Sequence, residues 1–201
     1  MIRILLAEDQ AMMRGALAVL LDLEDDLQVV AQVADGAEIV PTAIRERPDV
    51  ALLDIEMPHV SGLDAAAELA ELLPECLVVI VTTFGRPGYL QRAMASGVAG
   101  FLVKDQPVGN LAESIRQVVA GSTVIDPQLA GAALRSPASP LTARERDVLR
   151  AAQDGTTVGD IADALFLSES TVRNYLSAAI GKTGTRNKTE AAVLARERGW
   201  L

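Results

Sequence analysis

The sequence predicts an α/β fold, a doubly wound five-stranded parallel sheet, followed by a small all-α domain. Over the first 121 residues, short apolar runs alternate with longer amphipathic segments, which is the pattern of repeated βα units. These apolar runs leave no polar face for solvent, as is typical of parallel strands covered by helices on both sides. From Leu141 to Leu201 no strand-like run remains, and glycines interrupt a helical periodicity.

Five strands and five helices are expected in the first domain. The strands are Ile2–Ala7, Gln28–Val33, Val50–Leu53, Leu77–Thr82 and Gly100–Val103. The helices lie between them, at about Ala11–Leu23, Ala37–Arg47, Gly62–Leu73, Pro87–Ser96 and Val108–Ala120. Asp35-Gly36 before the second helix, and Gly97 and Gly121 after the fourth and fifth, mark helix starts and ends. Five βα units with right-handed crossovers predict a doubly wound sheet with helices on both faces, and we expect the strand order 2-1-3-4-5.

A linker and a helical domain follow this pattern. Residues 122–139 lose the regular periodicity, so we expect them to link a first domain at 1–121 to a second at 140–201. Helices are expected at Ala143–Gln153, Val158–Leu165, Glu169–Ile180 and Lys188–Arg198. Thr142 and Glu145 fit a capping box, and Ser168 fits an N-cap of the third helix. The short turn Phe166–Ser168 predicts a helix-turn-helix.

Composition and charge restrict the class of protein. Half of the 201 residues are hydrophobic, which suffices for a core in each domain. No apolar stretch is long enough to cross a membrane, and a single cysteine and a single histidine exclude an internal disulfide and a histidine-rich metal site. We therefore expect a cytoplasmic protein without stable membrane insertion. Residues 1–126 carry 8 Lys/Arg and 19 Asp/Glu, whereas residues 127–201 carry 10 and 8, so only the second half suits a polyanion.

Polar residues follow four of the expected strands at the edge where ligands bind in such sheets. Glu8 and Asp9 follow the first strand, Asp54 follows the third, Thr82 ends the fourth and Lys104 follows the fifth. Three neighbouring carboxylates need a compensating cation, and hard oxygen ligands suit Mg²⁺. Asp54 is placed to attack a phosphoryl group while the metal and Lys104 neutralise its oxygens. The Thr82 hydroxyl could then donate to a phosphoryl oxygen.

Residues 1–121 resemble the receiver domain of two-component response regulators. The matching segments are Glu8-Asp9, Asp54–Pro58 with Gly62, Thr82 and Phe101–Lys104. The resemblance implies that Asp54 accepts a phosphoryl group from a sensor histidine kinase. It also implies that Mg²⁺ is bound by Asp9, Asp54 and the backbone carbonyl of Glu56, with Glu8 in the same acidic set. Thr82 and Phe101 are then expected to rearrange together on phosphorylation.

The second domain presents polar side chains suited to DNA. The candidate contacts are Ser170, Thr171, Arg173, Asn174 and Ser177 on the third helix, and Lys182 and Lys188 beyond it. Residues 140–198 resemble the LuxR-type helix-turn-helix, which implies a dimer on double-stranded DNA with half-sites about 34 Å apart. Tyr175, Thr183 and Thr185 depart from that pattern. The two threonines are expected to weaken the docking of the last helix.

The whole chain therefore resembles a NarL/LuxR-family response regulator. Four further segments resemble the DesR-like regulators of firmicutes and actinobacteria, namely Ala7–Gln10, Leu23–Asp26, Thr82–Tyr89 and Thr171–Tyr175. We expect a transcriptional regulator, not an enzyme, in which phosphorylation drives homodimerisation and sequence-specific DNA binding. The likeness to DesR implies membrane-lipid or transport genes as targets. Either the first and fifth helices or the fourth helix and fifth strand could form the dimer surface.

Three alternatives share part of this pattern: a phosphatase, a nucleotide-binding domain and a regulator that does not use phosphate. A phosphatase of the haloacid-dehalogenase type would use Asp54 as its nucleophile but needs a second aspartate where Glu56 stands. A nucleotide-binding domain needs a glycine-rich loop after the first strand, where Glu8-Asp9-Gln10 supplies acid. A regulator that never uses phosphate would not need the complete acidic set.

Overall fold

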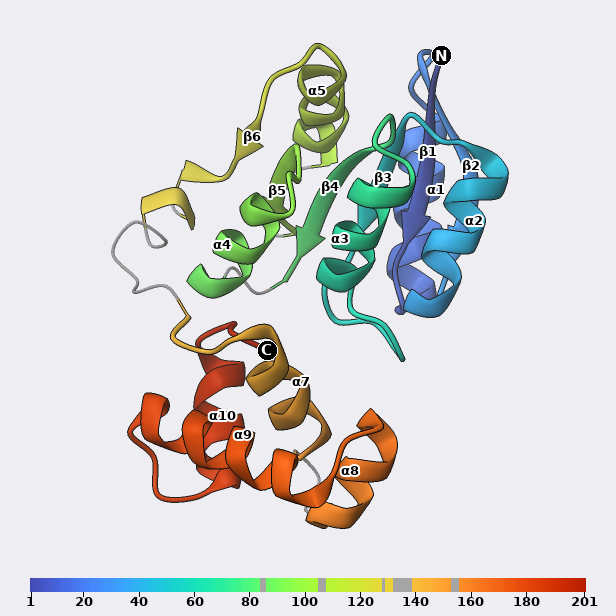
Figure 1. Cartoon of the computed structure of the whole chain (residues 1–201). Coiled ribbons are helices and arrows are strands. Elements are labelled where there is room, and N and C mark those ends of the chain that lie inside the picture. The colour runs from blue at the N-terminus through green and yellow to red at the C-terminus, as the bar shows by residue number, and fades with distance from the viewer. Residues whose placement is uncertain (84–85, 105–107, 128, 132–138, 153–155) are drawn as a thin grey trace. The chain divides into compact units, whose positions relative to one another are not determined.

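A computed structural model describes the chain at residues 1–83, 86–104, 108–127, 129–131, 139–152 and 156–201. The chain forms two compact units, the first made mostly of residues 1–132 and the second mostly of residues 133–201. Residues 128 and 132–138 of the predicted linker (122–139) and the predicted helix end at Gln153 lie outside the described residues. Figure 1 shows an α/β first unit and a helical second unit.

The first unit is built on a parallel sheet. Its strands are β1 (Ile2–Ala7), β2 (Leu27–Val33), β3 (Val50–Leu53), β4 (Leu77–Thr82), β5 (Gly100–Val103) and β6 (Val124–Ile125). They pair in the order β2-β1-β3-β4-β5-β6, and every pair is parallel. The predicted order of the first five strands is confirmed. The predicted number was wrong, because the sheet has six strands.

The additional strand β6 comes from the segment predicted as linker. Val124 N–H donates to the Ala99 carbonyl at 3.0 Å, and Asp126 N–H donates to the Phe101 carbonyl at 3.1 Å. A strand of two residues is too short to produce an apolar run or a periodicity of two, which explains why the sequence pattern missed it. The sheet of the first unit therefore continues beyond residue 121, where the first domain was predicted to end.

Helices cover both faces of the sheet (Figure 1). They are α1 (Ala11–Asp22), the short 3₁₀ helix η1 (Gly36–Glu38), α2 (Ile39–Glu46), α3 (Gly62–Leu72), α4 (Pro87–Ala95) and α5 (Val108–Val119). The second helix was predicted as one segment, but its first turn is η1. The Asp35 side chain accepts a hydrogen bond from the Ala37 N–H there and so fixes the tight first turn.

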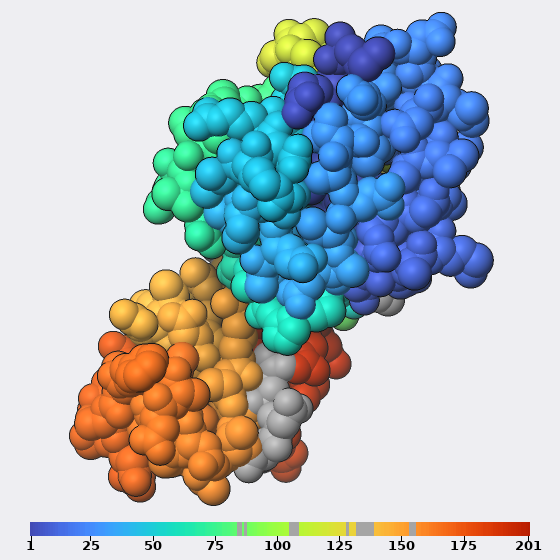
Figure 2. Space-filling view, turned by 90° about the vertical axis from the view of Figure 1, so that its right-hand side faces the viewer, coloured from blue at the N-terminus to red at the C-terminus, as the bar shows by residue number. Residues whose placement is uncertain are grey.

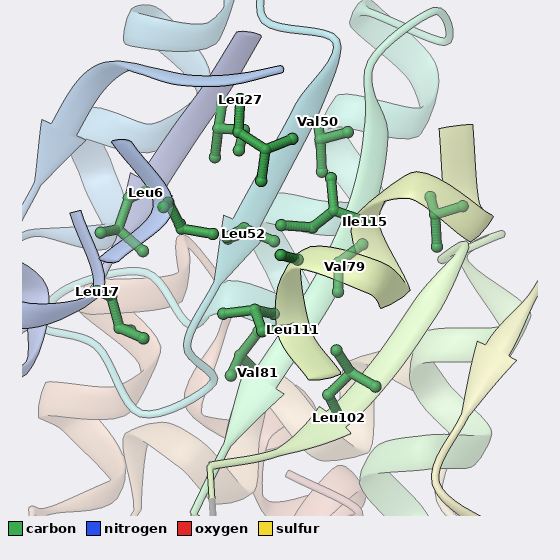
Figure 3. Packing of buried hydrophobic residues seen from close by; sticks show 14 of the residues in the cluster. Leu6, Leu17, Leu27, Val50, Leu52, Val79, Val81, Leu102, Leu111 and Ile115 are labelled. Atoms are coloured by element: carbon green, nitrogen blue, oxygen red, sulfur yellow. The ribbon is translucent and has the colours of Figure 1, made fainter. Parts of the chain in front are cut away.

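The core lies between the strands and their covering helices. Figure 3 shows Leu6, Leu52 and Val79 from three strands beside Leu111 and Ile115 from α5. All four residues of β3 are buried, as expected for a central strand covered on both faces. In the space-filling view, most of the visible surface of the first unit comes from its first two βα repeats, in blue and cyan (Figure 2).

The second unit consists of short capped helices, α7 (Ala143–Ala151), α8 (Val158–Leu165), α9 (Glu169–Thr183) and α10 (Lys188–Glu197). Side chains of Thr142, Thr157, Ser168 and Asn187 accept hydrogen bonds from the first turns of these helices. The third helix extends past its predicted end at Ile180. Gly184, with a φ of +67°, ends it in the left-handed conformation.

The last helix packs into the core of this unit despite the two threonines before it. Ala191 and Ala195 of α10 are fully buried in a cluster with residues of α7 and α9. Thr183 Oγ1 donates to the Ala179 carbonyl at 2.8 Å and lies 2.9 Å from Thr185 Oγ1. The expected weak docking therefore has no support in the packing, because the hydroxyls find partners locally. No helix in the described parts of the chain combines the length and apolar character needed to cross a bilayer.

Candidate functional site

Carboxylates gather where β1 and β3 end at the same edge of the sheet. Glu8 and Asp9 follow β1 directly, and Asp54 follows β3. One carboxylate oxygen from each of the three lies within 4.8 Å of the others. Glu8 and Asp54 are only 1% and 5% exposed, whereas Asp9 is exposed. The topology thus brings together the three acids that the sequence placed at strand ends.

Lys104, which follows β5, bridges the two buried carboxylates. Its Nζ lies 2.5 Å from Glu8 Oε2 and 2.8 Å from Asp54 Oδ2, and its side chain is 5% exposed. Burial alone would lower the pKa of Lys104, but the hydrogen bonds and charges of Asp54 and Glu8 outweigh it, so this pKa is raised. The lysine is therefore a fixed positive charge beside Asp54.

Both buried carboxylates have further hydrogen-bond donors. Glu8 Oε1 accepts from the Gln10 N–H at 3.2 Å, and Asp54 Oδ1 accepts from the Ile55 N–H at 2.7 Å. Burial raises the pKa of Glu8, and the Lys104 bond opposes this effect without cancelling it. Three hard oxygen donors at one edge fit a magnesium ion, and Asp9 is the carboxylate open to solvent.

The loop after Asp54 approaches that residue closely at Gly62. A Cβ on Gly62 would lie 1.9 Å from the Asp54 carbonyl oxygen, so no other residue fits without moving the loop. This explains why a glycine belongs to the motif. Glu56, whose backbone carbonyl was predicted as a metal ligand, is exposed in the same loop.

The two predicted switch residues are fully buried on neighbouring strands. Thr82 ends β4 and Phe101 lies on β5, and both are 0% exposed. Strand pairing places Thr82 opposite Val103 and Ile80 opposite Phe101. Phe101 therefore lies on the strand beside Thr82, two residues before the residue that pairs with Thr82.

The helix α9 carries most of the predicted DNA-contacting residues. Ser170, Arg173, Asn174 and Ser177 are exposed on it. Thr171 is half-buried, and its hydroxyl lies 2.8 Å from that of the N-cap Ser168. The structure thus presents four of the five predicted residues of this helix to solvent and engages the fifth at the helix start.

The predicted cations of this unit already have partners. Arg173 Nη2 lies 2.6 Å from Glu169 Oε2, and Lys188 Nζ donates to the Thr156 carbonyl. Lys182 Nζ donates at 2.8 Å to Glu145 Oε2. An incoming phosphate must therefore compete with these internal acceptors.

Glu145 is a buried carboxylate whose contacts the sequence pattern predicted only in part. It is 4% exposed and accepts from the Thr142 N–H at 2.7 Å, as the capping box predicts. Burial alone would raise the pKa of Glu145, but the bonds from Lys182 and Thr142 outweigh it, so the pKa is lowered. The link to Lys182 joins the start of α7 to the last turn of α9. Its partners are 37 positions apart, which no local pattern reveals.

Comparisons with known proteins agree with this arrangement. Residues 4–116 match the response regulator receiver domain, and residues 139–195 match the bacterial regulatory proteins of the luxR family. The chain is 46% identical to the uncharacterized transcriptional regulatory protein YvfU and 45% identical to the transcriptional regulatory protein DesR, both of Bacillus subtilis, over the full length of each. The crystal structure of the response regulator ChrA of a haem-sensing two-component system is 31% identical, with a TM-score of 0.57 over 100% of this chain and 98% of that one.

These matches confirm the family predicted from the sequence, including the likeness to DesR. They also agree with the fold, since a parallel α/β sheet with an acidic strand-end cluster precedes a helix-turn-helix unit. The chain belongs to the LuxR family of two-component response regulators, with an N-terminal receiver domain and a C-terminal LuxR-type DNA-binding domain.

Proposed function

We propose that Asp54 accepts a phosphoryl group from a sensor histidine kinase. The observation that carries this proposal is the buried Asp54 carboxylate, 2.8 Å from the Lys104 ammonium and beside two further acids. A carboxylate oxygen attacks phosphorus, the phosphorus–nitrogen bond of the phosphohistidine breaks, and the imidazole leaves with the electron pair. Lys104 stabilises the negative charge of the transferring oxygens from a fixed position.

The same acids would hold magnesium. Asp9, Asp54 and the backbone carbonyl of Glu56 supply hard oxygen ligands, and Glu8 adds charge while holding Lys104. When bound, the ion neutralises negative charge on the phosphoryl oxygens.

Phosphorylation would then act on Thr82 and Phe101. The Thr82 hydroxyl can donate to a phosphoryl oxygen only after that group is attached to Asp54. Both residues are fully buried, so a shift of Thr82 requires the side chains around Phe101 to repack. This repacking is the proposed route from a covalent change to a new surface.

The proposed output is a homodimer that binds double-stranded DNA. Treating the chain with acetyl phosphate and Mg²⁺ is expected to convert a monomer into a dimer, measured by sedimentation velocity. Removing Mg²⁺ with a chelator should prevent the change, because three carboxylates around the single Lys104 ammonium keep a net negative charge that repels an anionic donor. An identical sedimentation profile with and without the donor would contradict the mechanism.

Helix α9 is proposed to read base edges in the major groove. Ser170, Asn174 and Ser177 would contribute hydrogen bonds beside Arg173, and Thr171 a contact near the helix start. Lys182 and Lys188 would meet phosphates, although each must first leave an internal acceptor. The targets implied by the DesR likeness, membrane-lipid or transport genes, stay a prediction, since YvfU is equally similar.

Replacing Arg173 with alanine is expected to weaken binding to a selected operator by about 1 to 3 kcal/mol, the cost of a lost bidentate base contact. The operator can be selected from random duplexes with the wild-type chain, and affinity measured by fluorescence anisotropy. Arg173→Lys is the matched variant, since it keeps the charge but loses the planar fork. Full affinity in the lysine variant would assign Arg173 to phosphate instead.

A further inference from the structure

Arg14 holds the backbone of the two acids that follow β1. It lies in the first turn of α1 and is half-buried. Its Nη1 donates to the Glu8 carbonyl at 2.6 Å and lies 3.4 Å from the Asp9 carbonyl. Neither the proposed phosphoryl transfer nor the metal ligands listed above require this guanidinium, so its place beside the acidic set calls for a separate explanation.

The three carboxylates differ in what fixes them. Both oxygens of Glu8 accept hydrogen bonds, from Gln10 N–H and Lys104, and both oxygens of Asp54 accept them from Ile55 N–H and Lys104. Within the described part of the chain, no hydrogen bond or ion pair reaches the Asp9 carboxylate. Its direction is therefore set by its own backbone.

The other hydrogen bonds of this turn leave the carbonyls of Glu8 and Asp9 to Arg14: the Glu8 N–H donates to the Val33 carbonyl, and the Gln10 N–H donates to Glu8 Oε1. Gln10, the N-cap of α1, makes no side-chain cap hydrogen bond, and the first turn of the helix contains no acidic residue. The Arg14 guanidinium thus ties α1 to the two carbonyls of the Glu8-Asp9 turn, in addition to the bond between the Gln10 N–H and the Glu8 carboxylate. Two carbonyls gathered on one planar donor leave the turn little freedom to rotate.

We propose that Arg14 is a positioning residue that keeps the Asp9 carboxylate directed at Asp54, so that the magnesium ligands are in place before the ion arrives. The inference rests on the proposed magnesium site. Residues that orient metal ligands without touching the metal commonly control metal affinity. Arg14 acts here through the main chain of the ligand residue.

An electrostatic role and a positioning role for Arg14 predict opposite changes in Mg²⁺ affinity when the residue is replaced. A cation near three acids disfavours Mg²⁺, so a residue that acted through charge alone would tighten Mg²⁺ binding when neutralised. A residue that positions Asp9 would weaken binding when its two hydrogen bonds are lost. The sign of the change therefore separates the two roles.

The test is the dissociation constant of Mg²⁺ for the full chain, measured by isothermal titration calorimetry. Arg14→Gln and Arg14→Lys are both expected to raise it, by roughly 10-fold, as for other residues that orient metal ligands. Tighter binding in the glutamine variant with no change in the lysine variant, or no change in either, would overturn the proposal. Arg45→Gln, at an exposed arginine paired with Glu46 on α2, is the matched control and should bind as wild type does.

A second measurement separates positioning from general damage to the fold. Phosphorylation of the Arg14 variants by acetyl phosphate should need more Mg²⁺ but reach the wild-type rate at saturating Mg²⁺. A lower rate that added Mg²⁺ does not restore would contradict a positioning role. If the wild-type chain itself does not bind Mg²⁺, the proposed metal site is wrong. If the wild-type chain binds Mg²⁺ and the Arg14 variants bind it equally well, only the Arg14 inference is wrong.

Discussion

Replacing Asp54 with alanine or asparagine is expected to abolish phosphorylation of the chain by acetyl phosphate and Mg²⁺. An acyl phosphate forms only on a carboxylate oxygen, and neither side chain offers that nucleophile at this buried position. Intact-protein mass spectrometry should show one added phosphoryl group on the wild-type chain and none on either variant. We expect complete loss of phosphorylation, because neither Glu8 nor Asp9 lies at the end of β3 in contact with Lys104, as Asp54 does.

Asp49 provides a matched control for this result. It precedes β3 at the opposite end of the strand and is exposed, where its carboxylate accepts a hydrogen bond from the Arg3 N–H. Asp49→Asn should therefore label as wild type does. Undiminished labelling of both Asp54 variants would remove Asp54 as the acceptor and with it the proposed mechanism.

Replacing Glu145 with alanine is expected to destabilise the DNA-binding domain by about 2 to 4 kcal/mol, since it removes the capping-box bond to the Thr142 N–H and a charge-assisted hydrogen bond to Lys182. The single tryptophan, Trp200, belongs to the core of this domain, so its fluorescence during urea unfolding reports on this domain. A variant with the wild-type midpoint and slope would show that the buried carboxylate adds nothing to stability.

The same residue gives a pH dependence of known sign. Because the pKa of Glu145 in the folded domain is lowered from the ordinary 4.5, its stabilisation is fully present above that pH and is lost as the pH falls through the lowered pKa. Glu145→Gln should be less stable near neutral pH and should lose less stability on acidification. Parallel stability curves for the two proteins would contradict the assignment.

Much of the receiver site could be predicted from the sequence because strand ends converge in a parallel sheet. Glu8, Asp54 and Lys104 each follow an apolar run, and the topology alone places them at one edge. The hydrogen bonds from Arg14 to two backbone carbonyls could not be predicted, because every residue type has a backbone carbonyl and the sequence does not show which one a side chain reaches. Likewise, the partner of Lys182 depends on how α7 crosses α9, which periodicity does not encode.

In the helical domain, too, some features could be predicted from the sequence and others could not. Its helix starts were predictable because Thr142 and Ser168 are local capping signals. Its candidate DNA-contacting cations were predicted by residue type alone, and the structure adds that Arg173 and Lys188 have internal acceptors. Local chemistry thus predicts α9 as the helix that reads DNA, whereas the internal acceptor of each cation depends on how the helices pack.

The short strand β6 determines where this protein can be divided. A receiver fragment that ends at residue 121 strips the outer edge of β5 and leaves the carbonyls of Ala99 and Phe101 without their strand partners. Uncovered edges of this kind recruit strands from other molecules and promote aggregation. A fragment that continues through Asp126 retains the protective strand and should remain soluble as an isolated domain.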